Sequence, residues 1–146
     1  MDRRSGYTVS LLVNAALLYL VNVRPGWQAV PFLTSETVAV LDAVNLTLIA
    51  SLVTNAIYLV VDPPWLRALG DLVVAVIGLL ALVALWRVFP FDLWRDFPFD
   101  LAGQAFDWAL VARVLLVLGS VGTVVAILAA LVRLVAGLTA GSARTP

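Results

Sequence analysis

The chain has 146 residues, of which 63% are hydrophobic and 12% are charged, and its mean hydropathy is +1.06. Soluble domains are about half apolar, so this composition indicates a protein that resides in a lipid bilayer. Its nine basic and nine acidic residues cancel, and the basic residues are too scattered to indicate binding to nucleic acid.

The chain contains no cysteine, no histidine and no lysine, so all nine basic residues are arginine. These absences exclude disulfides, thiol redox chemistry, Schiff-base catalysis and the usual nitrogen and sulfur ligands of zinc and haem. The sequence therefore gives no reason to expect a cofactor, a metal ion or an enzymatic activity.

Four apolar runs predict membrane-spanning helices over residues 5–23, 36–61, 64–88 and 106–137. A helix needs about 20 mostly apolar residues to cross a hydrocarbon core of about 30 Å. Asn14 and Asn22 interrupt the first run and no small-residue cleavage site follows it, which favours a span over a secretory signal. We expect a single membrane domain, residues 1–146, folded as an all-α four-helix transmembrane bundle.

The breaks between the runs have the residues that end and start helices. Residues 24–26, Arg-Pro-Gly, end the first run, and Trp27 is expected at the lipid headgroups. Thr34 or Ser35 is expected to cap the second helix, with Glu36 in its first turn.

Between the second and third runs the chain reads Asp-Pro-Pro-Trp over residues 62–65, which predicts a tight antiparallel helix pair with Asp62 as a cap. Arg67 and Asp71 follow at a spacing of four residues, so we expect them to form an ion pair along the third helix.

Residues 86–101 read WRVFPFDLWRDFPFDL, one octapeptide written twice with Val88 replaced by Asp96. We interpret this tandem as a short interfacial segment between the third and fourth helices, with its aromatic rings among the lipid headgroups. A docking surface for a protein partner is the alternative, because exposed aromatic residues with arginine are typical anchors. The candidate interfacial or docking residues are Trp86, Phe89, Phe91, Asp92, Trp94, Arg95, Phe97, Phe99 and Asp100.

Polar residues inside membrane spans are costly and indicate function by default. At 1.5 Å per residue they fall into two layers. The inner layer consists of Asn14, Asn55 and Asp71. It is either a hydrogen-bonded packing cluster or part of a substrate site.

The outer layer consists of Asp42, Asn45 and Arg113. Asp42 and Arg113 come level, so we expect an ion pair that fixes the register of the helices. The alternative is a titrating carboxylate or cation site at Asp42.

Small residues at three- and four-residue spacing mark the fourth helix. They permit close approach of another helix, either within the bundle or in a second copy of the chain. These helix-packing candidates are Gly119, Gly122, Ala126 and Ala130.

An even number of spans places both termini on one side of the membrane. That side holds five arginines, Arg3, Arg4, Arg67, Arg133 and Arg144, against four on the other, Arg24, Arg87, Arg95 and Arg113. The positive-inside rule then predicts cytoplasmic termini for a multi-pass protein of the inner (plasma) membrane.

Three segments carry a family resemblance: NVRPGWQAVPF at 22–32, VDPPWLRALGD at 61–71 and WRVFPFD at 86–92. With its four spans, the chain resembles a family of uncharacterised small integral membrane proteins of actinobacterial type. The resemblance implies the four-span fold and implies no catalytic residues.

The sequence favours a non-enzymatic polytopic membrane protein that acts as a scaffold or an accessory subunit of a membrane assembly. Its expected partners are the lipid bilayer and either a second copy or a larger membrane complex. The alternative is a small transporter or an ion or proton channel that uses the intramembrane Asp and Asn residues. A scaffold should bury these residues as matched pairs, whereas a transport pathway should place them on one water-accessible surface.

Overall fold

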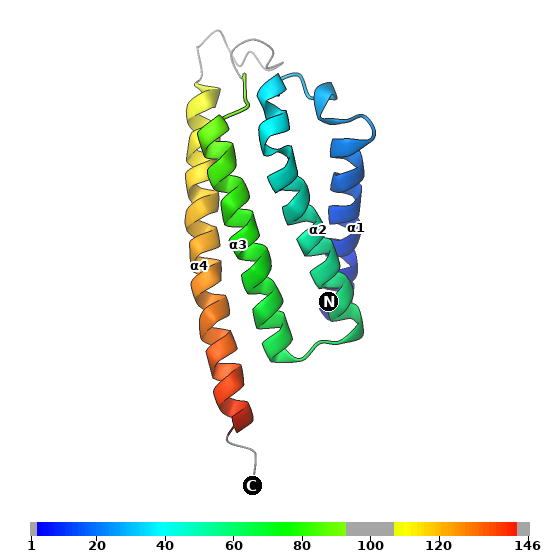
Figure 1. Cartoon of the computed structure of the whole chain (residues 1–146), viewed down its shortest axis with the longest axis vertical. Coiled ribbons are helices and arrows are strands. Elements are labelled where there is room, and N and C mark those ends of the chain that lie inside the picture. The colour runs from blue at the N-terminus through cyan, green and yellow to red at the C-terminus, as the bar shows by residue number, and fades with distance from the viewer. Residues whose placement is uncertain (1–2, 93–106, 143–146) are drawn as a thin grey trace.

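The computed structural model describes residues 3–92 and 107–142, and this part of the chain is helical with short connections (Figure 1). The helices are α1 (Arg3–Asn22), α2 (Val38–Val60), α3 (Pro64–Val88) and α4 (Trp108–Ser142). Two 3₁₀ turns, η1 (Trp27–Ala29) and η2 (Ser35–Thr37), lie between α1 and α2. All four helices are long and apolar enough to cross a membrane. The expected all-α four-helix bundle is confirmed, and the chain is a multi-pass membrane protein.

The helices run alternately up and down, so α1 begins and α4 ends at the same end of the bundle (Figure 1). The closest packing is between helices that follow one another in the chain: α1 with α2, α2 with α3, and α3 with α4. Helix α4 extends past the α2–α3 connection at this end. We call it the terminal end and the opposite end, which carries η1 and η2, the loop end.

Helix contacts are made by few and mostly small side chains. Val40, Ala68, Ala81, Leu116 and Ala130 are buried, whereas most leucine and valine side chains of all four helices are exposed. Lipid tails are as apolar as leucine, so large apolar side chains gain little by leaving the bilayer, and close backbone approach stabilises the contacts instead. The exposed apolar surface is therefore the lipid-facing surface of the bundle.

The helix starts differ in detail from the expected caps. Neither Thr34 nor Ser35 makes a side-chain capping bond, and the turn η2 leads directly into α2. Pro63 is the N-cap of α3 and Pro64 its first residue, so Asp62 stands one residue too early to cap the helix. Proline at the first helical position is favoured because its missing N–H would have no partner there.

The first copy of the octapeptide ends α3 and turns back across the loop end. Phe89 follows the helix with a left-handed backbone (φ 45°), and the buried Pro90 comes next. The carbonyl of Pro90 accepts a hydrogen bond from the N–H of Thr34 at 2.9 Å, and the N–H of Asp92 donates to the carbonyl of Phe32 at 2.9 Å. These bonds join the segment after α3 to the α1–α2 connection. The second copy, including Trp94, Arg95, Phe97, Phe99 and Asp100, lies outside the described residues.

Helices α2 and α3 pack tightly at Gly70. A methyl group added there would overlap the hydroxyl of Tyr58 and lie 2.6 Å from the Thr54 methyl carbon, whereas one added at Gly122 would meet nothing within 4 Å. We expect Gly70→Ala to lower the thermal unfolding midpoint in detergent, since overpacking a helix contact costs roughly 1–3 kcal/mol. Gly122→Ala is the matched control and should leave the midpoint unchanged or slightly raised. Equal midpoints for the two variants would contradict the close α2–α3 packing.

Candidate functional site

One face of α2 is polar through the terminal half of the helix. Thr47, Ser51, Thr54, Asn55 and Tyr58 recur at three- and four-residue intervals and so share a face. Three of these side chains donate to the carbonyl four residues earlier: Thr47 to Ala43 at 2.9 Å, Thr54 to Ala50 at 2.6 Å and Asn55 to Ser51 at 2.7 Å. Their donors are thus satisfied within the helix, while their oxygens remain able to accept further bonds.

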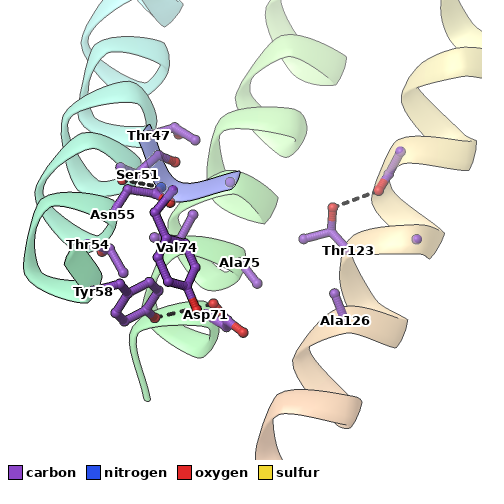
Figure 2. Close-up of a pocket in the computed structure, with 14 residues that line it drawn as sticks. Thr47, Ser51, Thr54, Asn55, Tyr58, Asp71, Val74, Ala75, Thr123 and Ala126 are labelled. Atoms are coloured by element: carbon purple, nitrogen blue, oxygen red, sulfur yellow. Dashed lines mark hydrogen bonds between the residues drawn. The ribbon is translucent and has the colours of Figure 1, made fainter. Parts of the chain in front are cut away.

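This face lines a cavity of about 510 Å³ to which every helix contributes (Figure 2). Figure 2 shows the α2 side chains and Asp71 of α3 on one side, with Thr123 and Ala126 of α4 across from them. Tyr7 of α1 completes the lining, together with Val74, Ala75, Gly78, Gly119 and Gly122. Small residues on α3 and α4 leave the space that the α2 side chains face.

A second hollow, of about 490 Å³, shares Tyr7, Tyr58 and Asp71 with the first and reaches Arg67 and Arg133 at the terminal end. We call the two together the polar groove. On α3 its lining extends from Pro64 to Gly78, roughly 21 Å along the helix axis at 1.5 Å per residue. The hydrocarbon core is about 30 Å thick. The lining therefore extends from the terminal end of α3 to beyond the middle of this helix.

Asp71 is the carboxylate inside the polar groove. Its Oδ2 lies 3.5 Å from Nη1 of Arg133 on α4, and its Oδ1 lies 3.2 Å from the hydroxyl of Tyr58, which also lies 2.8 Å from the carbonyl of Arg67. The two charged side chains are 42% and 58% exposed. A long, exposed ion pair of this kind contributes little stability, so the carboxylate is held loosely and can exchange partners.

The expected Arg67–Asp71 pair along α3 is not the one observed. Arg67 Nε lies 2.9 Å from Oδ1 of Asp62, whose Oδ1 also accepts a hydrogen bond from the hydroxyl of Tyr7 at 3.2 Å. Asp71 pairs across the groove with Arg133 instead. Arg67 instead pairs with Asp62 at the α2–α3 turn, and no other arginine of the described residues forms an ion pair with Asp62.

The outer layer of polar residues does not join the groove. Asn45 and Asn22 exchange two hydrogen bonds of 2.8 Å between their amide groups and so link α2 to α1. The expected ion pair between Asp42 and Arg113 is absent from the described part of the chain. Asp42 is exposed, and the guanidinium carbon of Arg113 lies 4.8 Å from the ring centre of Phe89 and 5.8 Å from that of Trp86.

The structure thus divides the sequence-based candidates by location. Asn55 and Asp71 line the groove with Gly119, Gly122 and Ala126, whereas Ala130 is buried outside its lining. Asn14 donates to the carbonyl of Ser10 in its own helix at 2.7 Å and does not line the groove. The sequence reasoning missed Tyr7, Tyr58, Thr47, Ser51 and Thr54, although the helical spacing of the α2 residues could have revealed them.

Within residues 3–92 and 107–142, no three acidic side chains gather as a metal site would require. Comparison with protein-family models, with curated proteins and with solved structures finds no match to this chain.

The partners of Arg113 can be tested by a double-mutant cycle. We expect Arg113→Gln and Phe89→Leu to couple by about 0.5–1 kcal/mol, the size of an exposed cation–π contact. Arg113→Gln and Asp42→Asn should be additive because no ion pair joins them. Thermal or denaturant unfolding in detergent gives both values. Coupling with Asp42 and none with Phe89 would restore the ion pair that the sequence indicated.

Proposed function

We propose that the protein is a small non-enzymatic transporter that moves a proton or a monovalent cation through the polar groove. The observation that carries the proposal is the polar groove itself, whose two hollows share Tyr7, Tyr58 and Asp71 and bring together hydroxyl, amide and carboxylate groups from four helices. Lipid cannot satisfy such groups, so water or a solute occupies the space between them.

Asp71 is the group that would bind the cation. It is the carboxylate of the groove, its ion pair with Arg133 is long and exposed, and the Tyr58 hydroxyl lies beside it. An incoming proton or cation would compete with Arg133 for the carboxylate. Asn55 and the α2 hydroxyl oxygens then offer ligands deeper in the groove.

The loop-end half of the bundle is apolar. Val40, Leu41, Val44 and Leu85 line an apolar hollow there, and none of them lines the polar groove. Groove and apolar half together resemble one state of an alternating-access cycle, with the binding site exposed to a single side. Transport would require the apolar half to open while the terminal end closes.

Removing the charge of Asp71 tests this proposal. In liposomes with proton and monovalent-cation indicators, we expect the parent protein to carry flux and Asp71→Asn to lower it at least tenfold. Asp42→Asn removes the same charge from an exposed position outside the groove, and we expect it to retain the parent flux. Equal loss in both variants, or no flux from folded parent protein, would overturn the transport proposal.

A scaffold or accessory subunit is the second candidate, and the open face of α4 favours it. Many large apolar side chains of α4, such as Leu115 and Leu118, are exposed, and a transmembrane helix of a second copy or a larger complex could pack against them. The Asn22–Asn45 pair is also the kind of matched contact that fixes helices without transporting anything. Folded protein that carries no flux would make this the leading candidate.

We further propose that the termini are cytoplasmic in the inner (plasma) membrane, so that the polar groove opens to the cytoplasm. The arginine count of the two sides supports this orientation. The chain lacks cysteine, so Ser5→Cys on α1 and Gln28→Cys in η1 each provide a single thiol. An impermeant maleimide added to intact cells should label Gln28→Cys and leave Ser5→Cys unlabelled until the membrane is opened. The reverse pattern would place the groove on the outside.

A further inference from the structure

The two hollows of the polar groove differ in charge. Both are lined by Tyr7, Tyr58 and Asp71, but Arg67 and Arg133 line only the hollow at the terminal end. We call the other, of about 510 Å³, the deep hollow. Asp71 is the one charged side chain among the described residues that line it. The deep hollow therefore attracts a cation and repels an anion.

The hydrogen bonds that the hydroxyl groups of the deep hollow already make restrict what it can bind. Thr47, Thr54 and Thr123 donate to the carbonyl four residues earlier, at 2.9, 2.6 and 2.7 Å. The nearest acceptor of the Tyr58 hydroxyl is a backbone carbonyl at 2.8 Å, and the hydroxyl of Tyr7 donates to a carboxylate oxygen at 3.2 Å; neither acceptor belongs to this lining. A hydroxyl whose proton is engaged can only accept further hydrogen bonds. An occupant must therefore supply the donors.

Few donors remain in the lining of the deep hollow. Asn55 donates one amide hydrogen to the carbonyl of Ser51 at 2.7 Å. Its other amide hydrogen and the Ser51 hydroxyl make no hydrogen bond within the described part of the chain. Against these two donors stand five accepting hydroxyls, the Asn55 carbonyl oxygen and the Asp71 carboxylate. This balance favours an occupant that carries several N–H donors and a positive charge.

The size of the deep hollow distinguishes a metal ion from an organic cation. A water molecule takes about 30 Å³ in the liquid, so a single dehydrated ion would fill little of the 510 Å³. Pockets for small organic ligands measure about 300–1,000 Å³ and are mostly apolar with a few polar groups. Most polar side chains here lie on α2, and Figure 2 shows the space between them and α4. The rest of the α3 and α4 lining is mostly small and apolar: Val74, Ala75, Gly78, Gly119, Gly122 and Ala126.

We propose that the deep hollow binds a small primary alkylammonium ion, with its nitrogen against Asp71 and its alkyl chain along the small residues of α3 and α4. An alkylamine is protonated at neutral pH because its pKa is close to that of lysine, about 10.4. Arg133 lies 3.5 Å from Oδ2 of Asp71, which leaves Oδ1 to the ammonium group. The inference rests on the proposed function, because the amine is the solute that the polar groove would carry.

The first test is isothermal titration calorimetry of the purified full chain in detergent with butylammonium chloride. We expect saturable binding that Asp71→Asn weakens at least tenfold, the loss expected for a hydrogen bond to a charged partner. Asp42→Asn removes the same charge from an exposed position outside the groove and should bind as the parent does. No binding to the folded parent, or equal affinities of the two variants, would overturn the site.

Three further ligands test the chemistry of recognition. Butyrate has a similar chain with the opposite charge, tetramethylammonium has the charge without an N–H donor, and Na⁺ has the charge without a chain. Each should bind at least tenfold more weakly than butylammonium. Butyrate or tetramethylammonium bound as tightly would refute the argument from charge or from donors, and Na⁺ bound as tightly would refute the argument from volume.

Two pairs of variants test the walls of the deep hollow. Thr123→Val removes an accepting oxygen and should weaken binding about fivefold, the effect of one hydrogen bond, whereas Thr8→Val removes a hydroxyl outside the groove and is its control. Ala126→Phe fills the hollow, whereas Ala129→Phe makes the same change at an exposed position of α4 outside its lining. The first should abolish binding and the second should not, with thermal midpoints showing that both fold. Unchanged affinity in Thr123→Val and Ala126→Phe would contradict the proposal.

Binding and flux are separate measurements, so the two proposals can fail separately. Flux in the liposomes without binding of butylammonium would refute the amine site and leave the transport proposal standing. Binding that Asp71→Asn removes, with no flux from the folded parent, would support the amine site and overturn the transport proposal.

Discussion

A helix in lipid has no water to satisfy its polar groups, and this constraint explains most of the local structure of the bundle. The backbone is satisfied by the helices themselves. Polar side chains within the spans are also satisfied within their own helix, since threonine and asparagine side chains donate to the carbonyl one turn earlier. The Thr and Asn side chains of the polar face of α2 therefore need no hydrogen-bond partner on a facing helix. Thr34 and Thr37, at the start and end of η2, do not follow this pattern, since their hydroxyl oxygens are buried without a hydrogen-bond partner among the described residues.

The same constraint shapes the packing between helices. Apolar side chains gain little by leaving lipid, so the helices meet where glycine leaves room for a neighbour's side chain: Gly70 of α3 lies against Tyr58 and Thr54 of α2, and Gly119 of α4 lies against Leu82 of α3. Packing in chain order leaves the terminal end open between the helices, and the polar groove occupies this space. The absence of a large buried core among the described residues is therefore the expected result of folding in a bilayer.

The sequence predicted the number, direction and approximate bounds of the helices because apolar length and Pro-Gly breaks determine them directly. Side-chain partners were harder to predict. Arg113 and Asp42 lie at a similar depth along their helices. Depth does not show which way a side chain points around the helix axis, and Arg113 contacts the rings of Phe89 and Trp86 instead. Asp71 of α3 pairs with Arg133 of α4. The sequence did not predict this pair, because Arg67 lies four residues from Asp71 and was expected to be its partner. By contrast, Asn22 ends α1 at the depth of Asn45, so their pairing could have been inferred from the hairpin geometry.

Helix α2 connects the two cavities, since residues 37–44 line the apolar one and residues 47–58 the polar one. Its character thus changes along its axis as well as around it. The hydrophobic periodicity of a helix is averaged over its whole length and reports only the difference between its faces. It therefore does not detect that one half of the helix is apolar and the other half polar. The division has a physical origin in the position of each half. The loop-end half packs beneath the α1–α2 connection, where Val40 and Pro90 are buried, whereas the terminal half faces the space that small residues of α3 and α4 leave open. One membrane helix can therefore present an apolar surface at one depth and a hydrogen-bonding surface at another.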